Sequence, residues 1–175
     1  MIELPKLRVD DVLQSRHFSE HQQIALSYRP FYDWFLMATE VFQDTYLKLS
    51  IVAEGIDVEK EWVEYIKSHK NWEVQVHCWE HKELHHTEYE QVKKELTMAK
   101  EKIEDTFHQK VTQFYPPRHK VSGHIFNACK ELGLSVELDE YIPRWWLVYP
   151  NQIPEIYFHF WVQNHIDTVK KIYGK

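Results

Sequence analysis

The stretch WEVQVHCWEHKELHHTEYEQVKKELTMAKEKIEDTF occupies residues 72–107 and joins an expected strand to an expected helix. Residues 72–77 form the strand candidate. Further along, apolar side chains recur at steps of three and four, which is the spacing of an amphipathic helix: Tyr89, Val92, Leu96, Ala99, Ile103 and Phe107. Thr87 and Glu90 have the spacing of a capping box, which predicts that this helix begins beside them.

Strand-like and helix-like segments alternate along the whole chain. The strand candidates are residues 6–12, 45–53, 72–77, 111–115, 134–138, 145–149 and 156–161. One further helix is expected behind Pro30, and another over residues 166–173. Asp57 and Ser122 are each expected to cap a helix, and Gly133 is expected to end the helix that Ser122 caps. This alternation predicts an α/β fold with a mainly parallel sheet, either open and doubly wound or closed into a small irregular (β/α) barrel of about seven strands. No repeat or linker divides the chain, so we expect a single domain over residues 1–175.

Composition narrows the class of protein. The chain has 175 residues, of which 43% are hydrophobic and 27% charged, as expected for a folded domain. A net charge of −6 argues against a dedicated nucleic-acid binder. No apolar run reaches the roughly 18 residues of a membrane helix, and the first residues do not resemble a signal peptide, so we expect a cytoplasmic protein without membrane contacts. Cys78 and Cys129 do not form a disulfide framework.

Titratable residues gather at the ends of the expected strands. Asp10 and Asp11 end the first strand, the segment from His77 to His81 follows the third, and Tyr115 to His119 follow the fourth. His159 lies in the last strand candidate. Active sites of parallel α/β folds lie at the carboxyl ends of the strands, so these residues are the candidates for a functional site.

The spacing of His77 and His81 suits a metal under one condition. Residues four apart on a helical turn share a face, whereas on an extended strand they lie roughly 13 Å apart, too far for one ion. The pair therefore predicts a metal site only if the chain turns helical after His77. Two surface histidines at a helix start are an equally good interpretation. His81 and His85 resemble a zinc-protease motif with a misplaced Glu, which we disfavour, and Cys78 is better interpreted as a small buried residue.

Asp10, Asp11 and His159 each allow two interpretations. Adjacent strand residues point to different sides, so the two carboxylates could divide metal binding and proton transfer between them. They could equally cap the turn that follows the strand. A lone histidine in an apolar strand, such as His159, is more often a hydrogen-bonded core residue than a catalytic group.

In their order along the chain, these motifs resemble the polysaccharide deacetylase family of carbohydrate esterases. Val9-Asp10-Asp11 is similar to the family's T-F-D-D motif, and residues 77–81 to its H-(S/T)-x-x-H motif. Residues 114–118 resemble the R-P-P-(Y/F)-G segment, residues 129–136 resemble A-x-x-x-G-(Y/L)-x-V, and residues 156–159 resemble the closing strand that ends in a catalytic His. The resemblance implies an irregular (β/α) barrel.

The resemblance also implies a role for each candidate residue. Asp11, His77 and His81 would bind one divalent transition metal, with zinc the first choice from the ligand types. Asp10 would be the general base and His159 the general acid. The site for the oxyanion and the substrate would involve Tyr115 and Arg118. Tyr115 departs from the family pattern, because it occupies the place of an Arg that helps to hold the base. Asp139 is near a later acidic motif of the family, but we assign it no role.

These roles predict a metal-dependent hydrolase that removes an acyl group, typically N-acetyl, from a carbohydrate or small amide. One alternative is a degenerate relative that binds a metal, ligand or partner without catalysis, for which Tyr115 is the main argument. Another is a structural protein with incidental histidines. The sequence does not decide the acyl group, the substrate, the metal or the oligomeric state. Nucleotide binding is unsupported, because the chain has neither common glycine-rich phosphate motif.

Overall fold

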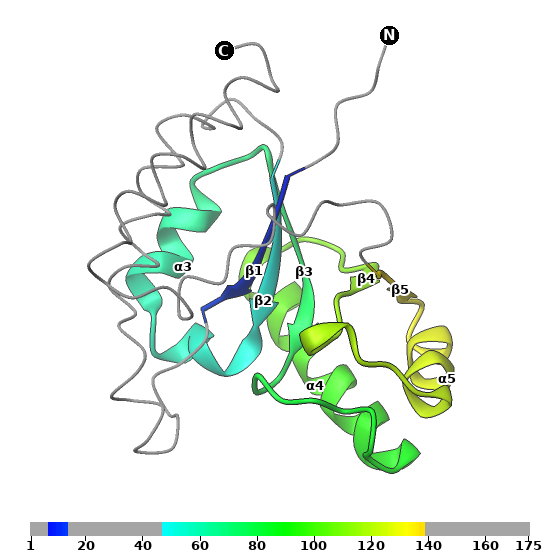
Figure 1. The fold of residues 1–175 in the computed structure, drawn as a ribbon. Helices are drawn as coiled ribbons and strands as arrows, with labels where there is room; N and C mark the ends of the chain where they lie inside the picture. The colour runs from blue at the N-terminus through cyan, green and yellow to red at the C-terminus, as the bar shows by residue number, and fades with distance from the viewer. Residues whose placement is uncertain (1–6, 14–46, 139–175) are drawn as a thin grey trace, which may run out of the picture.

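Five parallel strands form one sheet in the computed structural model, which describes residues 7–13 and 47–138 (Figure 1). The strands are β1 (Leu7–Val12), β2 (Leu47–Val52), β3 (Trp72–Cys78), β4 (Gln113–Phe114) and β5 (Ser135–Val136). The helices are η1 (Ala53–Asp57), α3 (Lys60–Lys67), α4 (Tyr89–Phe107), η2 (Pro117–His119) and α5 (Gly123–Glu131). The prediction of an α/β fold with a parallel sheet is therefore confirmed.

The described strands lie side by side in the order in which they occur in the chain, β1-β2-β3-β4-β5. A doubly wound sheet reverses its strand order at a switch point, and the five described strands contain no such reversal. The strand candidates at residues 145–149 and 156–161 and the helices expected behind Pro30 and over residues 166–173 lie outside the described residues. A barrel of about seven strands thus stays a prediction.

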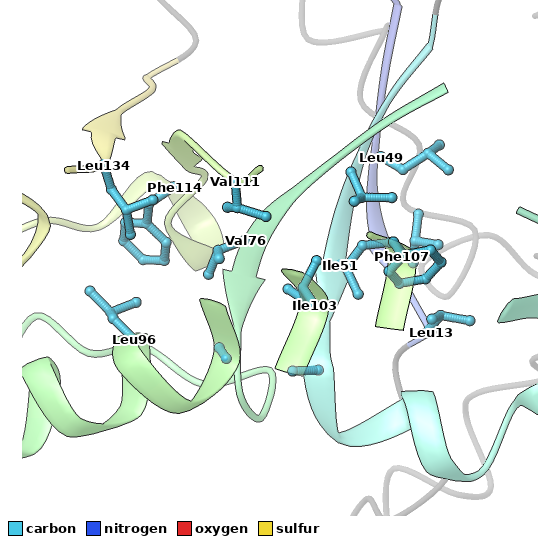
Figure 2. Close-up of a cluster of buried hydrophobic side chains, with 14 of the residues drawn as sticks. Leu13, Leu49, Ile51, Val76, Leu96, Ile103, Phe107, Val111, Phe114 and Leu134 are labelled. Carbon is cyan, nitrogen blue, oxygen red and sulfur yellow. The ribbon is translucent and has the colours of Figure 1, made fainter. Parts of the chain in front are cut away.

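Helix α4 packs its apolar stripe against the sheet, as the spacing of its residues predicts. Val92, Leu96, Ala99, Ile103 and Phe107 are all buried. Figure 2 shows Ile103 and Phe107 in one cluster with Leu49 and Ile51 of β2 and Val76 of β3. Among the helices that the structure describes, none combines the length and the apolar character that crossing a membrane requires.

Two of the three predicted helix caps are wrong. Helix α4 begins at Tyr89 behind Glu88, without a side-chain cap. The Thr87 N–H donates to the Leu84 carbonyl at 3.0 Å, so it is engaged in a turn and does not serve a capping box. Asp57 closes η1 rather than capping α3, and its carboxylate accepts a hydrogen bond from Lys102 at 2.7 Å.

The cap of α5 is confirmed. The Ser122 hydroxyl accepts a hydrogen bond from the Ile125 N–H at 3.4 Å. Gly133 follows the helix with a φ of +67°, a backbone conformation that favours glycine at the end of a helix.

The turn behind β1 depends on a glycine of η1. Leu13 has a φ of 62°, a backbone conformation that residues other than glycine rarely adopt. Its carbonyl oxygen lies only 1.5 Å from the point where a Cβ on Gly55 would be. A residue without a side chain is therefore required at position 55 for η1 to approach the end of β1.

Candidate metal-binding and catalytic site

Strand β1 contains a register shift at its two aspartates. Val9 pairs with Leu49 and Val12 with Ile51, so Asp10 and Asp11 together lie opposite the one residue between those partners on β2. Such a β-bulge changes the direction of side chains and is common beside active sites. Strict alternation therefore does not decide where the two carboxylates point. The Asp10 side chain is buried, with 3% of its surface exposed.

Strand β3 contains a second register shift, at the first candidate histidine. Ile51 pairs with Val76 and Val52 with Cys78, so His77 is the extra residue on β3. His77 and Cys78 are both buried, and the interpretation of Cys78 as a small buried residue agrees with its position. The two bulges thus lie at the two motifs that the sequence had singled out.

Four buried polar residues lie on three neighbouring strands: Asp10 on β1, Ser50 on β2, and Gln75 and His77 on β3. Their apolar neighbours Leu49, Ile51, Val74 and Val76 belong to the hydrophobic core. Side chains alternate along a strand, so Ser50 and Gln75 point to the opposite face of the sheet from α4. The side-chain Oε1 of Gln75 accepts hydrogen bonds from the backbone N–H groups of Thr112 at 3.0 Å and Gln113 at 2.8 Å, which ties β3 to β4.

The ring of His77 is oriented by the next strand. Its Nδ1 lies 2.6 Å from the backbone carbonyl of Tyr115. A carbonyl only accepts hydrogen bonds, so Nδ1 must donate, and the lone pair of the neutral ring is then on Nε2. Histidines that bind metals are oriented in this way by a carbonyl behind the ring.

His81 lies beside His77, although the chain does not form a helix between them. The two rings stack with centroids 5.1 Å apart and an interplanar angle of 24°. Residues 79–88 contain no helix or strand, so the two rings come together without the helical turn that the spacing analysis required. The Lys82 N–H donates to the Glu80 carbonyl at 2.7 Å, and this tight turn brings His81 back toward β3. The ring of His85, the alternative partner, lies instead beside the ring of His86, with centroids 3.7 Å apart and the planes tilted by 43°.

The loop that carries His81 is attached to α4 by an ion pair. Lys82 Nζ lies 2.7 Å from Glu95 Oε2, and Glu95 is only 4% exposed. Burial raises the pKa of the Glu95 carboxyl, and Lys82 opposes this effect. Sequence reasoning missed Glu95, although its place beside Leu96 on the apolar stripe was a signal that it would be buried.

Tyr115 is engaged through three of its polar groups. Its N–H donates to the Val76 carbonyl at 2.9 Å, its carbonyl accepts from His77, and its hydroxyl donates to Gln113 at 3.0 Å. The Tyr115 N–H therefore belongs to the sheet, and an oxyanion donor would have to come from another group.

Arg118 lies against the loop of His81. It has a φ of 53° and donates to Glu83 at 2.8 Å, next to Lys120, which donates to the same carboxylate at 2.8 Å. Lys120 and Arg118 lower the pKa of the Glu83 carboxyl below its usual value, with burial acting against them. The His81 loop and η2 are thus joined by charged hydrogen bonds.

The described residues supply part of the expected metal site. His77 and His81 lie close together with imidazole ligands of the type that zinc and other transition metals prefer, and the orientation of His77 fits such a role. Within residues 7–13 and 47–138, the described side chains include no group of three His, Cys, Asp or Glu suited to one ion. The structure does not describe the side chain of Asp11, and His159 and Asp139 lie outside the described residues.

Three solved structures share this fold. A mutant of a pseudoenzyme from Bacillus anthracis, with restored enzymatic activity, has 15% identity and a TM-score of 0.64 over 97% of this chain and 62% of its own. A deacetylase from Streptococcus pyogenes in complex with acetate has 13% identity and a TM-score of 0.54 over 58% of this chain and 48% of its own.

A third structure is an acetyl xylan esterase from Clostridium thermocellum in complex with a cobalt ion, with 15% identity and a TM-score of 0.51. It is matched over 75% of this chain and 55% of its own. The chain therefore spans between about half and two thirds of the length of these three proteins.

No curated protein matches the sequence. The sequence pattern of the family described as polysaccharide deacetylase matches residues 34–136, which is more than half of the chain. The chain belongs to the polysaccharide deacetylase family.

Proposed function

We propose that the chain is a metal-dependent hydrolase that removes an acyl group, typically N-acetyl, from a carbohydrate or a small amide. The observation that carries the proposal is the placement of His77. Its ring is held by the Tyr115 carbonyl at 2.6 Å and stacks on His81, at the end of a parallel strand. The buried Asp10 lies on the same sheet, two strands away.

Asp11, His77 and His81 would hold the metal, with zinc as the first choice. When bound, such an ion acidifies water and polarises an acyl carbonyl. Asp10 would accept the proton of the attacking water, and His159 would donate a proton to the departing amine. The amide C–N bond breaks and a C–O bond forms, so the products are a carboxylic acid and an amine.

The proposal includes a closed fold around this site. We infer that residues 1–175 form one catalytic domain, an irregular (β/α) barrel of about seven strands. The unreversed order of the five described strands supports a barrel over a doubly wound sheet. In a barrel, the face of the sheet opposite α4 becomes the interior, and Ser50, Gln75 and His77 would line it.

A second candidate function is a non-catalytic relative that binds a metal or ligand. Tyr115 favours it, because this residue replaces an Arg of the family pattern and its hydroxyl is bonded to Gln113. One structural neighbour, from Bacillus anthracis, is itself a pseudoenzyme. Retention of metal without hydrolysis of any acyl substrate would support this alternative.

The first experiment measures bound metal by elemental analysis in protein purified without a histidine tag. We expect about one equivalent in the wild type and little in Asp11→Ala. The matched pair His81→Ala and His85→Ala tests the ligand assignment, since only the first should lose metal. A site that empties in His85→Ala but stays full in His81→Ala would overturn the assignment.

The second experiment measures turnover of acetylated sugars and small amides by Asp10→Asn. Removal of a general base should lower kcat by about 10²- to 10⁴-fold while metal content stays unchanged. Asp57→Asn is the control, because Asp57 pairs with Lys102 at the surface. An unchanged rate in Asp10→Asn would exclude the base role.

A further inference from the structure

Glu95 is a buried carboxylate that the proposed function does not use. It is 4% exposed and lies next to Leu96 in the stripe of α4 that packs on the sheet. Among the helices within residues 47–138, it is the one buried polar or charged side chain. An apolar side chain of similar size at such a position is often at least as stabilising as a buried ion pair. Stability alone therefore does not explain a glutamate here.

The partner of Glu95 is the residue that directly follows His81. Lys82 Nζ lies 2.7 Å from Glu95 Oε2 and 3.5 Å from Glu80 Oε2. The other side of the same loop is attached to η1, because the Glu54 N–H donates to the Trp79 carbonyl at 3.0 Å. His81 thus lies between an anchor to η1 and an anchor to α4, and Glu83 further along the loop binds Arg118 and Lys120.

Of these contacts, the one to α4 is made by the residue nearest to His81 in the chain. The segment from Trp79 to Glu88 has no helical or strand hydrogen bonding of its own, so its conformation depends on such contacts. An ion pair with one nearly buried partner keeps a more definite geometry than one between two solvated side chains. Its effect on His81 would be transmitted through one peptide bond.

We propose that Glu95 is a positioning residue that, through Lys82, holds His81 in place to bind the metal. The inference rests on the proposed function, in which His81 is a ligand. Groups behind metal ligands commonly change metal affinity by 10- to 100-fold when they are removed. Glu95 and Lys82 would act as one unit in this role.

The test is a titration of the metal-free full chain with Co²⁺, followed by visible absorption. Lys82→Met and Glu95→Met should each raise the Kd about 10-fold or more. The double variant Lys82→Met/Glu95→Met should bind Co²⁺ no more weakly than either single variant, because each single variant already removes the Lys82–Glu95 ion pair. Lys82→Arg should restore binding to within about twofold, since the guanidinium keeps an ion pair with the carboxylate.

Lys93→Met is the matched control. It breaks an ion pair between Lys93 of α4 and Glu131 of α5, 2.6 Å apart, which does not involve the His81 loop. Its Kd for Co²⁺ should equal that of the wild type. Thermal unfolding of the metal-free variants separates loss of stability from loss of affinity: whatever stability Lys82→Met and Lys93→Met lose, only Lys82→Met should lose affinity for Co²⁺.

Three outcomes distinguish the inference from the function on which it rests. Weaker binding in both Met variants, with rescue by Lys82→Arg, supports the positioning role. Wild-type affinity in Lys82→Met and Glu95→Met overturns this role and leaves the metal site standing. A wild-type chain that binds no Co²⁺ overturns the metal site and the positioning role together.

Discussion

The two faces of the described sheet differ in composition although the same strands form them. Toward α4, β2 and β3 present Leu49, Ile51, Val74 and Val76, which belong to one hydrophobic cluster with the helix (Figure 2). Toward the other face, the neighbouring positions carry buried polar side chains, such as Ser50 and Gln75. The apolar face supplies burial that stabilises the fold, and the polar face places chemical groups at some cost in stability.

The polar face is itself divided along the strands. Near their amino ends, Lys48, Glu73 and Gln113 satisfy one another: Lys48 lies 3.9 Å from Glu73 and donates to Gln113, and the Gln113 amide donates to Glu137 at 3.0 Å. Near the carboxyl ends lie the two bulges with Asp10 and His77. The hydrogen-bonded network stabilises the strands near their amino ends, and the candidate functional residues lie at the carboxyl ends.

Ile51→Ala tests the apolar face and should have the largest effect. Ile51 is fully buried in the cluster with α4, so removing its side chain should lower the free energy of unfolding by about 3 kcal/mol. Denaturant unfolding measures this loss. Met98→Ala, at a half-exposed position of α4, should change the free energy of unfolding by less than about 0.5 kcal/mol. Equal losses in the two variants would contradict the packing of α4 on this face.

Gly55→Ala tests the close approach of η1 to the end of β1. An added Cβ would lie 1.5 Å from the Leu13 carbonyl oxygen, so the backbone must move. We expect a loss of about 2 kcal/mol in unfolding free energy. Gly123→Ala is the control, because a Cβ there meets nothing within 4 Å. A Gly55→Ala protein as stable as the wild type would show that β1 does not approach η1 in this way.

The sequence predicted the apolar face better than the polar one. Spacing identified the apolar stripe of α4, and sequence patterns separately predicted β2 and β3, because burial of apolar side chains follows the helical and strand periods. It also identified His77 and His81 as a pair. It did not predict how they meet, since the bends after Cys78 and the bulges at Asp10 and His77 depend on pairing with distant strands. Glu95 and Lys82 were missed for the same reason, because their contact joins a loop to a helix.

Glu104→Gln tests a polar contact at the edge of the apolar face, where α4 leads into β4. Burial raises the pKa of the Glu104 carboxyl, but hydrogen bonds from Lys100 and the Val111 N–H outweigh it and hold the pKa below its ordinary value of 4.5. The ionised form is therefore stabilised by folding. Its contribution is complete above pH 4.5 and is lost as the pH falls through the lowered pKa of the folded state.

We expect Glu104→Gln to lose about 1 kcal/mol of unfolding free energy at pH 7, with the difference from the wild type shrinking in acid. Urea unfolding at a series of pH values measures it. Glu101→Gln, at an exposed position of the same helix, is the control. A difference that stayed constant from pH 7 to pH 3 would show that the lost contact is not ionic.

Ser50→Ala should have the smallest effect on stability and gives the sharpest comparison, because Ser50 is the neighbour of Ile51 on the opposite face. The Ser50 hydroxyl is fully buried and has no hydrogen-bond partner among the described residues. Removing a buried hydroxyl that lacks a partner gives back its desolvation cost, so the unfolding free energy should stay within about 0.5 kcal/mol of the wild type or rise. If Ser50→Ala instead lost as much stability as Ile51→Ala, both faces of β2 would serve packing alone. In that case the polar face would not be the side on which to look for chemistry.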